Sequence, residues 1–145
     1  MLGISKSWAL VGLLVAALAG TRLAADPPLD QPFVEGLLQR HLYPLAEAYC
    51  RRELGETGLS ARRRARLTAE LVRIHAAAAV QLPPDERPDR WRQAHQVAAT
   101  YLAQHAGDEY AVLVQHQDAV THMTRGQLAR YEAETASDPA VVQAV

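Results

Sequence analysis

Apolar side chains recur at intervals of three and four residues through most of the chain, which is the spacing of one face of an α-helix. The clearest example follows Ser60, a residue type that can cap a helix, where Leu67, Leu71 and Ile74 share one face. No segment alternates with the two-residue period of a strand, and the sequence contains neither Asn-Gly nor Asp-Gly. The pattern therefore predicts an all-α fold.

Prolines and glycines divide this pattern into five helices. Pro32 and Pro44 each suit the first turn of a short helix, where the missing N–H is not needed. Pro83 and Pro84 end the long helix that follows Ser60, because proline cannot continue it. The expected helices span residues 33–40, 44–54, 60–82, 90–105 and 109–134. We treat residues 33–134 as one helical domain.

Alanine dominates the expected helix interfaces. The chain has 27 alanines and a single phenylalanine, a composition that favours helices packed at short distance over a sheet. Ala46 lies between Tyr43 and Tyr49 at helical spacing, so it allows close backbone approach while the flanking rings fill the space beside it. The predicted core consists of Leu37, Tyr43, Ala46, Tyr49, Leu71, Ile74, Ala78, Ala98, Leu102 and Leu113.

The N-terminal segment has the pattern of an export signal. Lys6 precedes an uncharged apolar run of 13 residues at 8–20, and small residues at 17–19 and 23–25 offer cleavage sites. The run is shorter than the roughly 20 residues of a spanning helix, which favours a cleaved signal over a permanent anchor. Residues 1–25 are therefore expected to be a signal peptide or an N-terminal anchor, followed by a proline-rich linker at 26–32.

The expected location follows from this segment. Export would place the protein in the periplasm or cell envelope, either free or anchored by residues 8–20. Any membrane contact is expected through that segment alone. At the other end, residues 135–145 have two interpretations. Ser137 and Pro139 resemble the start of a helix, so the segment is either a polar tail or the beginning of a truncated further helix.

Charge gives no general drive toward nucleic acid. The formal net charge is −1, with 14 arginines and one lysine among the basic residues. Arg62, Arg63, Arg64 and Arg66 form the one cluster, and no aromatic residue lies among them. We expect a solvated face paired with acidic residues such as Glu56 or Glu70. Docking of an acidic partner or a lipid head group is the alternative.

No motif indicates catalysis or a resident cofactor. The six histidines are His41, His75, His95, His105, His116 and His122, and no two lie three or four residues apart, so none are stacked as a helical metal site needs. Cys50, the only cysteine, has the character of a small buried hydrophobe. The sequence also lacks a glycine-rich phosphate loop and a nucleophile turn. We expect no enzyme activity, no catalytic residues, no cofactor and no metal.

The region around residue 43 resembles the tetratricopeptide repeat. In that family a glycine, an aromatic residue, an alanine and a further bulky residue mark the junction of two paired helices. Tyr43 and Ala46 match two of these places, and Tyr49 or Cys50 occupies the last. His41 stands where glycine is usual, and Glu53 where a second alanine is usual. Residues 91–107 look like the second helix of another repeat.

The order of motifs over residues 33–134 looks like the N-terminal region of large exported bacterial tetratricopeptide-like proteins. That resemblance implies antiparallel helical hairpins packed as a short solenoid, and a scaffold that mediates protein–protein interactions without catalysis. The expected partner is a protein of unknown identity. The alternative function is a self-contained helical bundle of the envelope that serves as an adaptor or small binding protein.

Overall fold

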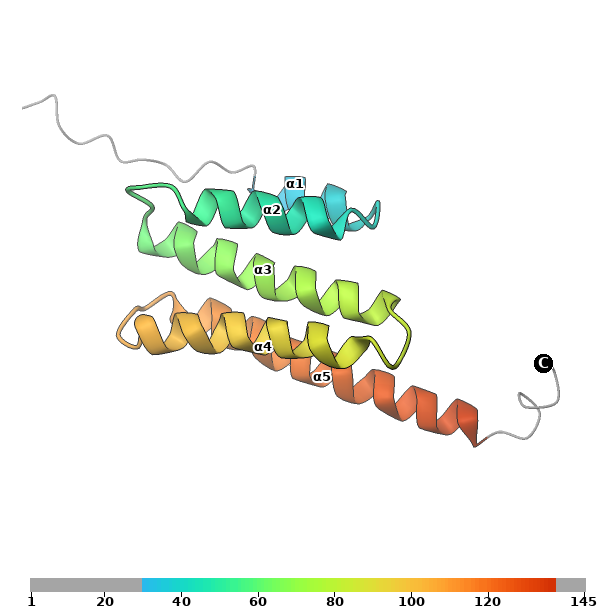
Figure 1. Ribbon diagram of the computed structural model, residues 1–145. Coiled ribbons are helices and arrows are strands. Elements are labelled where there is room, and N and C mark those ends of the chain that lie inside the picture. Colours follow the sequence, from blue (N-terminus) through green and yellow to red (C-terminus); the bar gives the residue numbers. More distant parts are fainter. Residues whose placement is uncertain (1–29, 138–145) are drawn as a thin grey trace, which may run out of the picture.

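The computed structural model describes residues 30–137, and this part of the chain is all-helical, without a strand (Figure 1). Its five helices are α1 (Asp30–Leu38), α2 (Tyr43–Leu54), α3 (Ala61–Gln81), α4 (Arg87–Gln104) and α5 (Ala111–Ala136). The predicted all-α class is confirmed. The segments interpreted as a signal peptide or anchor (1–25) and as most of the tail lie outside the described residues.

Two domain boundaries differ from the sequence prediction. Helix α1 begins at Asp30, so residues 30–32 form its first turn and do not belong to the linker. Proline is tolerated there, since the first helical N–H groups have no partner within the helix. Helix α5 continues to Ala136, which places residues 135 and 136 in the helix rather than in the tail. The hydroxyl of Ser137 then donates to the Ala133 carbonyl at 2.7 Å.

Helix α3 is the centre of the molecule. It lies between a layer formed by α1 and α2 and a layer formed by α4 and α5, and it packs against all four (Figure 1). Short connections make neighbouring helices run antiparallel. Within each layer the two helices also pack on each other, α1 on α2 and α4 on α5. The backbones of α2 and α4 stay more than 8 Å apart at every Cα, although Arg90 of α4 reaches Glu47 of α2 at 3.3 Å. This separation leaves one side of α3 open between them.

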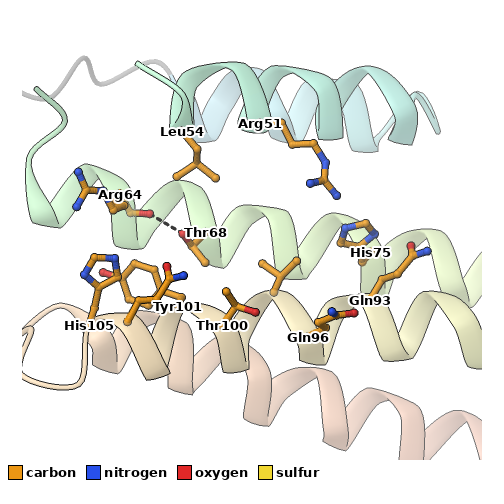
Figure 2. Close-up of a pocket in the computed structure, with 12 residues that line it drawn as sticks. Arg51, Leu54, Arg64, Thr68, His75, Gln93, Gln96, Thr100, Tyr101 and His105 are labelled. Atoms are coloured by element: carbon orange, nitrogen blue, oxygen red, sulfur yellow. Dashed lines mark hydrogen bonds between the residues drawn. The ribbon is translucent and has the colours of Figure 1, made fainter. Parts of the chain in front are cut away.

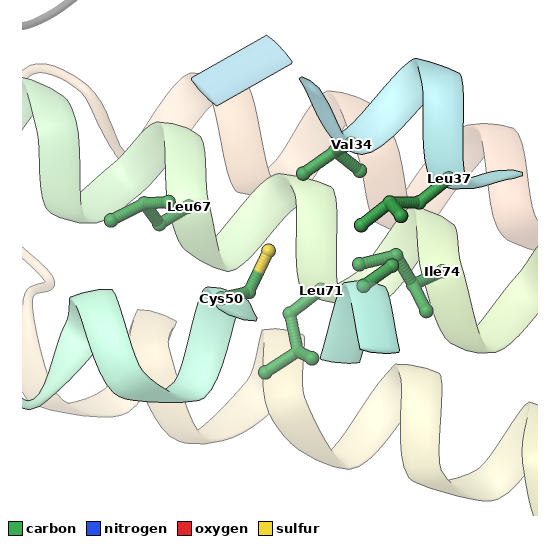
Figure 3. Packing of buried hydrophobic residues seen from close by; sticks show 7 residues of the cluster. Val34, Leu37, Cys50, Leu67, Leu71 and Ile74 are labelled. Carbon is green, nitrogen blue, oxygen red and sulfur yellow. The ribbon is translucent and has the colours of Figure 1, made fainter. Parts of the chain in front are cut away.

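The core occupies two opposite faces of α3. Large aliphatic residues of one face, Leu67, Leu71 and Ile74, pack against α1 and α2 (Figure 3). The other face is richer in small residues, and there Ala65 and Val72 meet α4 and α5 at Ala94, Ala98, Tyr101, Ala111 and Val114. A helix that is apolar on both sides is expected for a middle layer, since each side is covered by another element.

Most of the predicted core residues are buried, namely Leu37, Ala46, Leu71, Ile74, Ala78 and Ala98. Tyr43, Tyr49 and Leu102 are half-buried and pack at the margins of the two clusters. The prediction is wrong for Leu113, which is 37% exposed. Its neighbours Ala111 and Val114 take the inward positions of α5, and each helical step of about 100° turns Leu113 away from them.

The turn between α1 and α2 has the geometry of a helix stop that usually needs glycine. The Leu42 N–H donates to the Leu37 carbonyl and the His41 N–H to the Leu38 carbonyl, both at 2.9 Å, which is a Schellman motif. His41 adopts φ 57°, in the left-handed region that glycine enters without strain. Its Nδ1 lies 2.9 Å from the Tyr43 hydroxyl. His41 is also the residue that stands where the tetratricopeptide pattern has glycine.

Arg63 joins the first three helices. Its guanidinium contacts Asp30 at 2.9 Å and Glu53 at 2.8 Å, and neither is the partner, Glu56 or Glu70, that the sequence suggested. Burial opposes ionisation of Asp30, but hydrogen bonds from Arg63 and Tyr49 hold its pKa below the ordinary value. Glu70 instead pairs with Arg73. The difference arises because Asp30 is brought to Arg63 only by tertiary packing.

Candidate binding groove

A groove of about 480 Å³ runs between α2 and α4, with α3 as its floor (Figure 2). It exists because the backbones of α2 and α4 stay apart while both helices pack on α3. Side chains of all three helices project into it, and most of them are polar. The lining residues are Arg51 and Leu54 of α2, Arg64, Thr68 and His75 of α3, and Gln93, Gln96, Val97, Thr100, Tyr101 and Gln104 of α4, with His105 beside them.

Helical periodicity places the glutamines along one wall. Gln93, Gln96, Thr100 and Gln104 are spaced by three or four residues, so they lie on the same face of α4. All four are exposed. Amide and hydroxyl groups both donate and accept hydrogen bonds. The wall can therefore satisfy the backbone or polar side chains of a bound polypeptide.

One end of the groove is basic. Arg64 and His105 lie there, and no carboxylate belongs to the described residues that line the groove. Tyr101 donates a hydrogen bond to Asp108 at 2.8 Å, and its ring contacts that of His105 with centroids 4.5 Å apart. Burial and the hydrogen bond to Asp108 raise the pKa of Tyr101 to about 12. The phenol thus stays protonated and serves to position the end of the groove.

The other end is acidic. A second hollow of about 690 Å³ shares Arg51 and Gln93 with the groove and continues it toward the loop between α3 and α4. Four carboxylates line this extension, Asp85, Glu86, Asp89 and Glu47, and Arg51 and Arg90 both pair with Glu47. The two hollows adjoin, and acidic residues outnumber basic ones only in the second.

His75 is the buried polar residue between these ends. Its side chain is 1% exposed, and its Nδ1 lies 3.3 Å from Arg90 Nη1 and 4.0 Å from Glu47 Oε2. Arginine can only donate, so Nδ1 accepts and the ring is neutral. Burial lowers the pKa of His75, and Arg90 and Arg51 add to this effect against the opposing charge of Glu47. The residue ties α3 to both walls of the groove.

A further hollow of about 650 Å³ lies on the other side of α3, between α1 and α5. Its carboxylates and Arg63 are already engaged within the protein. Arg63 holds Asp30 at 2.9 Å, and Arg73 holds Glu35 at 2.7 Å and Glu70 at 2.8 Å. A ligand there would have to compete with these pairs. The groove between α2 and α4 is therefore the stronger candidate for binding.

Cys50 is buried within the cluster between α1, α2 and α3 (Figure 3). Burial raises the pKa of its thiol to about 12. The thiolate is the reactive form of cysteine, so this side chain cannot act as a nucleophile near neutral pH. Cys50 therefore acts as a small apolar residue that fills space in this cluster, one turn after Ala46.

Two histidines and a carboxylate that sequence reasoning did not connect come together between α4 and α5. His95 Nδ1 donates to Asp118 Oδ1 at 2.6 Å, and His122 Nε2 lies 3.9 Å from Asp118 Oδ2. The two imidazole rings are stacked with centroids 3.8 Å apart. The signal available in the sequence was the four-residue spacing of Asp118 and His122. It was missed because only pairs of histidines were considered.

The other histidines do not join this group. His41 lies in the turn before α2, His75 and His105 line the groove, and His116 lines the hollow between α1 and α5.

Within residues 30–137, no helix is long and apolar enough to cross a membrane. No protein-family model, curated protein or solved structure matches the chain significantly.

Proposed function

We propose that this protein is an exported, non-catalytic helical scaffold that binds a segment of a partner protein in the groove between α2 and α4. The observation that carries the proposal is the groove with its adjoining hollow, which is lined by exposed glutamines and is basic at one end and acidic at the other. Such a lining suits a polypeptide, because both its backbone and its charged side chains find partners.

The packing order of the helices supports a tetratricopeptide-like arrangement, which would suit this function. Alternate helices α1, α3 and α5 pack in sequence, whereas α2 and α4 stay apart. Helical hairpins stacked in this way open on the side of the separated helices, and repeat proteins bind their partners on such surfaces. Ala46 is fully buried under the turn that carries the family-like residues, and His41 takes the glycine-like conformation.

The charges define the partner. Arg64 and His105 favour a segment with acidic residues toward the α4–α5 loop. Asp85, Glu86 and Asp89 favour basic residues toward the α3–α4 loop. Electrostatic complementarity of this kind sets the direction in which a chain lies and excludes the reverse orientation. The partner segment is thus a polar peptide of opposite charge at its two ends.

Export and the absence of catalysis complete the proposal. Lys6 and the apolar run at 8–20 support a signal peptide or anchor, which would bring the helical domain to the periplasm or cell envelope. The inert Cys50 thiol supports a binding role over nucleophilic catalysis.

Selection from a display library of random peptides against the purified full chain tests the groove. We expect enriched peptides to be acidic at one end and basic at the other, and their binding to weaken with added salt. Arg64→Glu should lower the affinity of these peptides, since it reverses the charge at the basic end.

Arg62→Glu provides the matched control. It makes the same charge change two residues earlier on α3, at an exposed position that does not line the groove. The parent affinity should persist in this variant. Peptides that bind Arg64→Glu as tightly as the parent, or a selection that enriches none, would refute the groove as the binding site.

A further inference from the structure

The group formed by His95, Asp118 and His122 has the composition of a transition-metal site. One ligand atom of each residue lies within 4.8 Å of the others. The packing of α4 against α5 brings the three residues together. Asp118 and His122 are one turn apart on α5, and His95 faces them from α4. Exposure of the His122 side chain, at 61%, gives an ion access from solvent.

One atom in the group lacks a partner. The Nε2 atom of His95 is buried, and it makes no hydrogen bond to any described residue. A buried polar atom of this kind usually has a partner, because leaving it unpaired costs free energy. The ring is held on its other side by the short hydrogen bond from Nδ1 to Asp118. His95 is thus fixed beside the carboxylate that would share the ion.

We propose that these three residues bind one divalent transition-metal ion, with Zn²⁺ as the best match. Two imidazoles and one carboxylate are the ligand set of zinc sites that keep a fourth position for water. Mg²⁺ and Ca²⁺ prefer sites built from oxygen alone, so a set with two nitrogens disfavours them. The single carboxylate neutralises part of the charge of the ion.

Binding requires a small rearrangement that the site permits. Ligand atoms around a tetrahedral zinc lie roughly 3.3 Å apart, given bonds of about 2.0–2.1 Å, so the 3.9 Å between His122 and Asp118 must shorten and the 2.6 Å between His95 and Asp118 must lengthen. The stacked rings cannot both point at one ion while parallel, and the more exposed His122 is free to turn. Imidazole and carboxylate groups bind an ion only in their unprotonated form, so affinity falls at low pH.

The proposed ion would brace α4 against α5 without entering the groove. Given about 100° per residue, His95 lies about 160° around α4 from Gln93 and Val97, about 140° from Thr100 and about 100° from Gln96, so it points away from the groove. The metal site and the peptide groove are therefore separate, and substitutions in one leave the other intact. The proposal does not depend on the proposed function.

Calorimetric titration of the untagged, chelator-treated full chain with Zn²⁺ tests the site. We expect one equivalent to bind at pH 7.5, and a melting temperature that rises with Zn²⁺ but not with Mg²⁺. His122→Ala and Asp118→Asn should each weaken binding by more than about tenfold, since losing even an outer-shell partner costs 10–100-fold. His122 is exposed, so its replacement should leave the fold intact.

His116→Ala is the matched control, because it removes an exposed histidine from the same helix outside the group. It should bind Zn²⁺ like the parent. Co²⁺ gives a second readout, with the visible absorption of a tetrahedral site in the parent and in His116→Ala only. Absence of stoichiometric binding, or equal loss in all three variants, would overturn the proposal, since scattered surface histidines would then explain any affinity.

Discussion

Ala46 shows how one small side chain sets the distance between helices. It is fully buried in the cluster that joins α1, α2 and α3. Ala46→Leu should overpack this contact and lower the free energy of unfolding by about 1–3 kcal/mol. Chemical denaturation measures the change. Ala48→Leu makes the same substitution at an exposed position of α2 and should have little effect. Equal midpoints for both variants would place Ala46 outside the core.

His75 gives the fold a response to mild acid. Its pKa is lowered from 6.5 in the folded protein, so above about pH 6.5 the ring is neutral in both states and contributes nothing to the pH dependence. As the pH falls below 6.5, the unfolded chain takes up the proton first. The folded state therefore loses stability down to the folded pKa.

The measurement is the free energy of unfolding at about pH 7.5 and pH 5.5, for the parent and for His75→Gln. The parent should lose more stability than the variant. Carboxyl groups with lowered pKa values, such as Asp30 and Glu47, act only below their ordinary values of 3.8 and 4.5, so they do not enter this window. An identical loss in the two proteins would assign the effect to other groups.

At the scale of the element, Gly126 lowers the stability of α5 and has no packing role that requires glycine. The helix continues through it to Ala136, and a Cβ built there would meet nothing within 4 Å. Gly126→Ala should raise the free energy of unfolding by about 0.5–1 kcal/mol, because alanine loses less backbone entropy in a helix. Gly58→Ala should act in the opposite direction, since Gly58 has φ 80°. If the melting temperatures of the two variants change in the same direction, the prediction is wrong.

The helices themselves were readable from the sequence because their signals are local. The Ser60 cap is present, with its oxygen accepting from Arg63 N at 3.2 Å, and α3 ends just before Pro83 as expected. The start of α1 was misplaced because Asp30 is held by Arg63, a contact made across 33 residues. Periodicity gives the faces of a helix, but it does not show which distant side chain stabilises its first turn.

At the scale of the whole molecule, the sequence could not show either site. The groove depends on α2 and α4 staying apart, and the histidine group depends on the rotation of α4 against α5. Both are set by how helices cross, which the spacing of residues within one helix does not encode. The charge change along the groove likewise combines Arg64 of one helix end with Asp85 and Glu86 of a loop at the other.

The central position of α3 has a consequence for the order of events in folding. Helices pack only with partners one or two elements away in the chain, and a protein with such local contacts is expected to fold quickly. Ile74 of α3 and Val34 of α1 are both fully buried in the same cluster. Ile74→Val should slow refolding, because the transition state has to assemble α3 first. Val34→Ala should mainly speed unfolding, because α1 docks late.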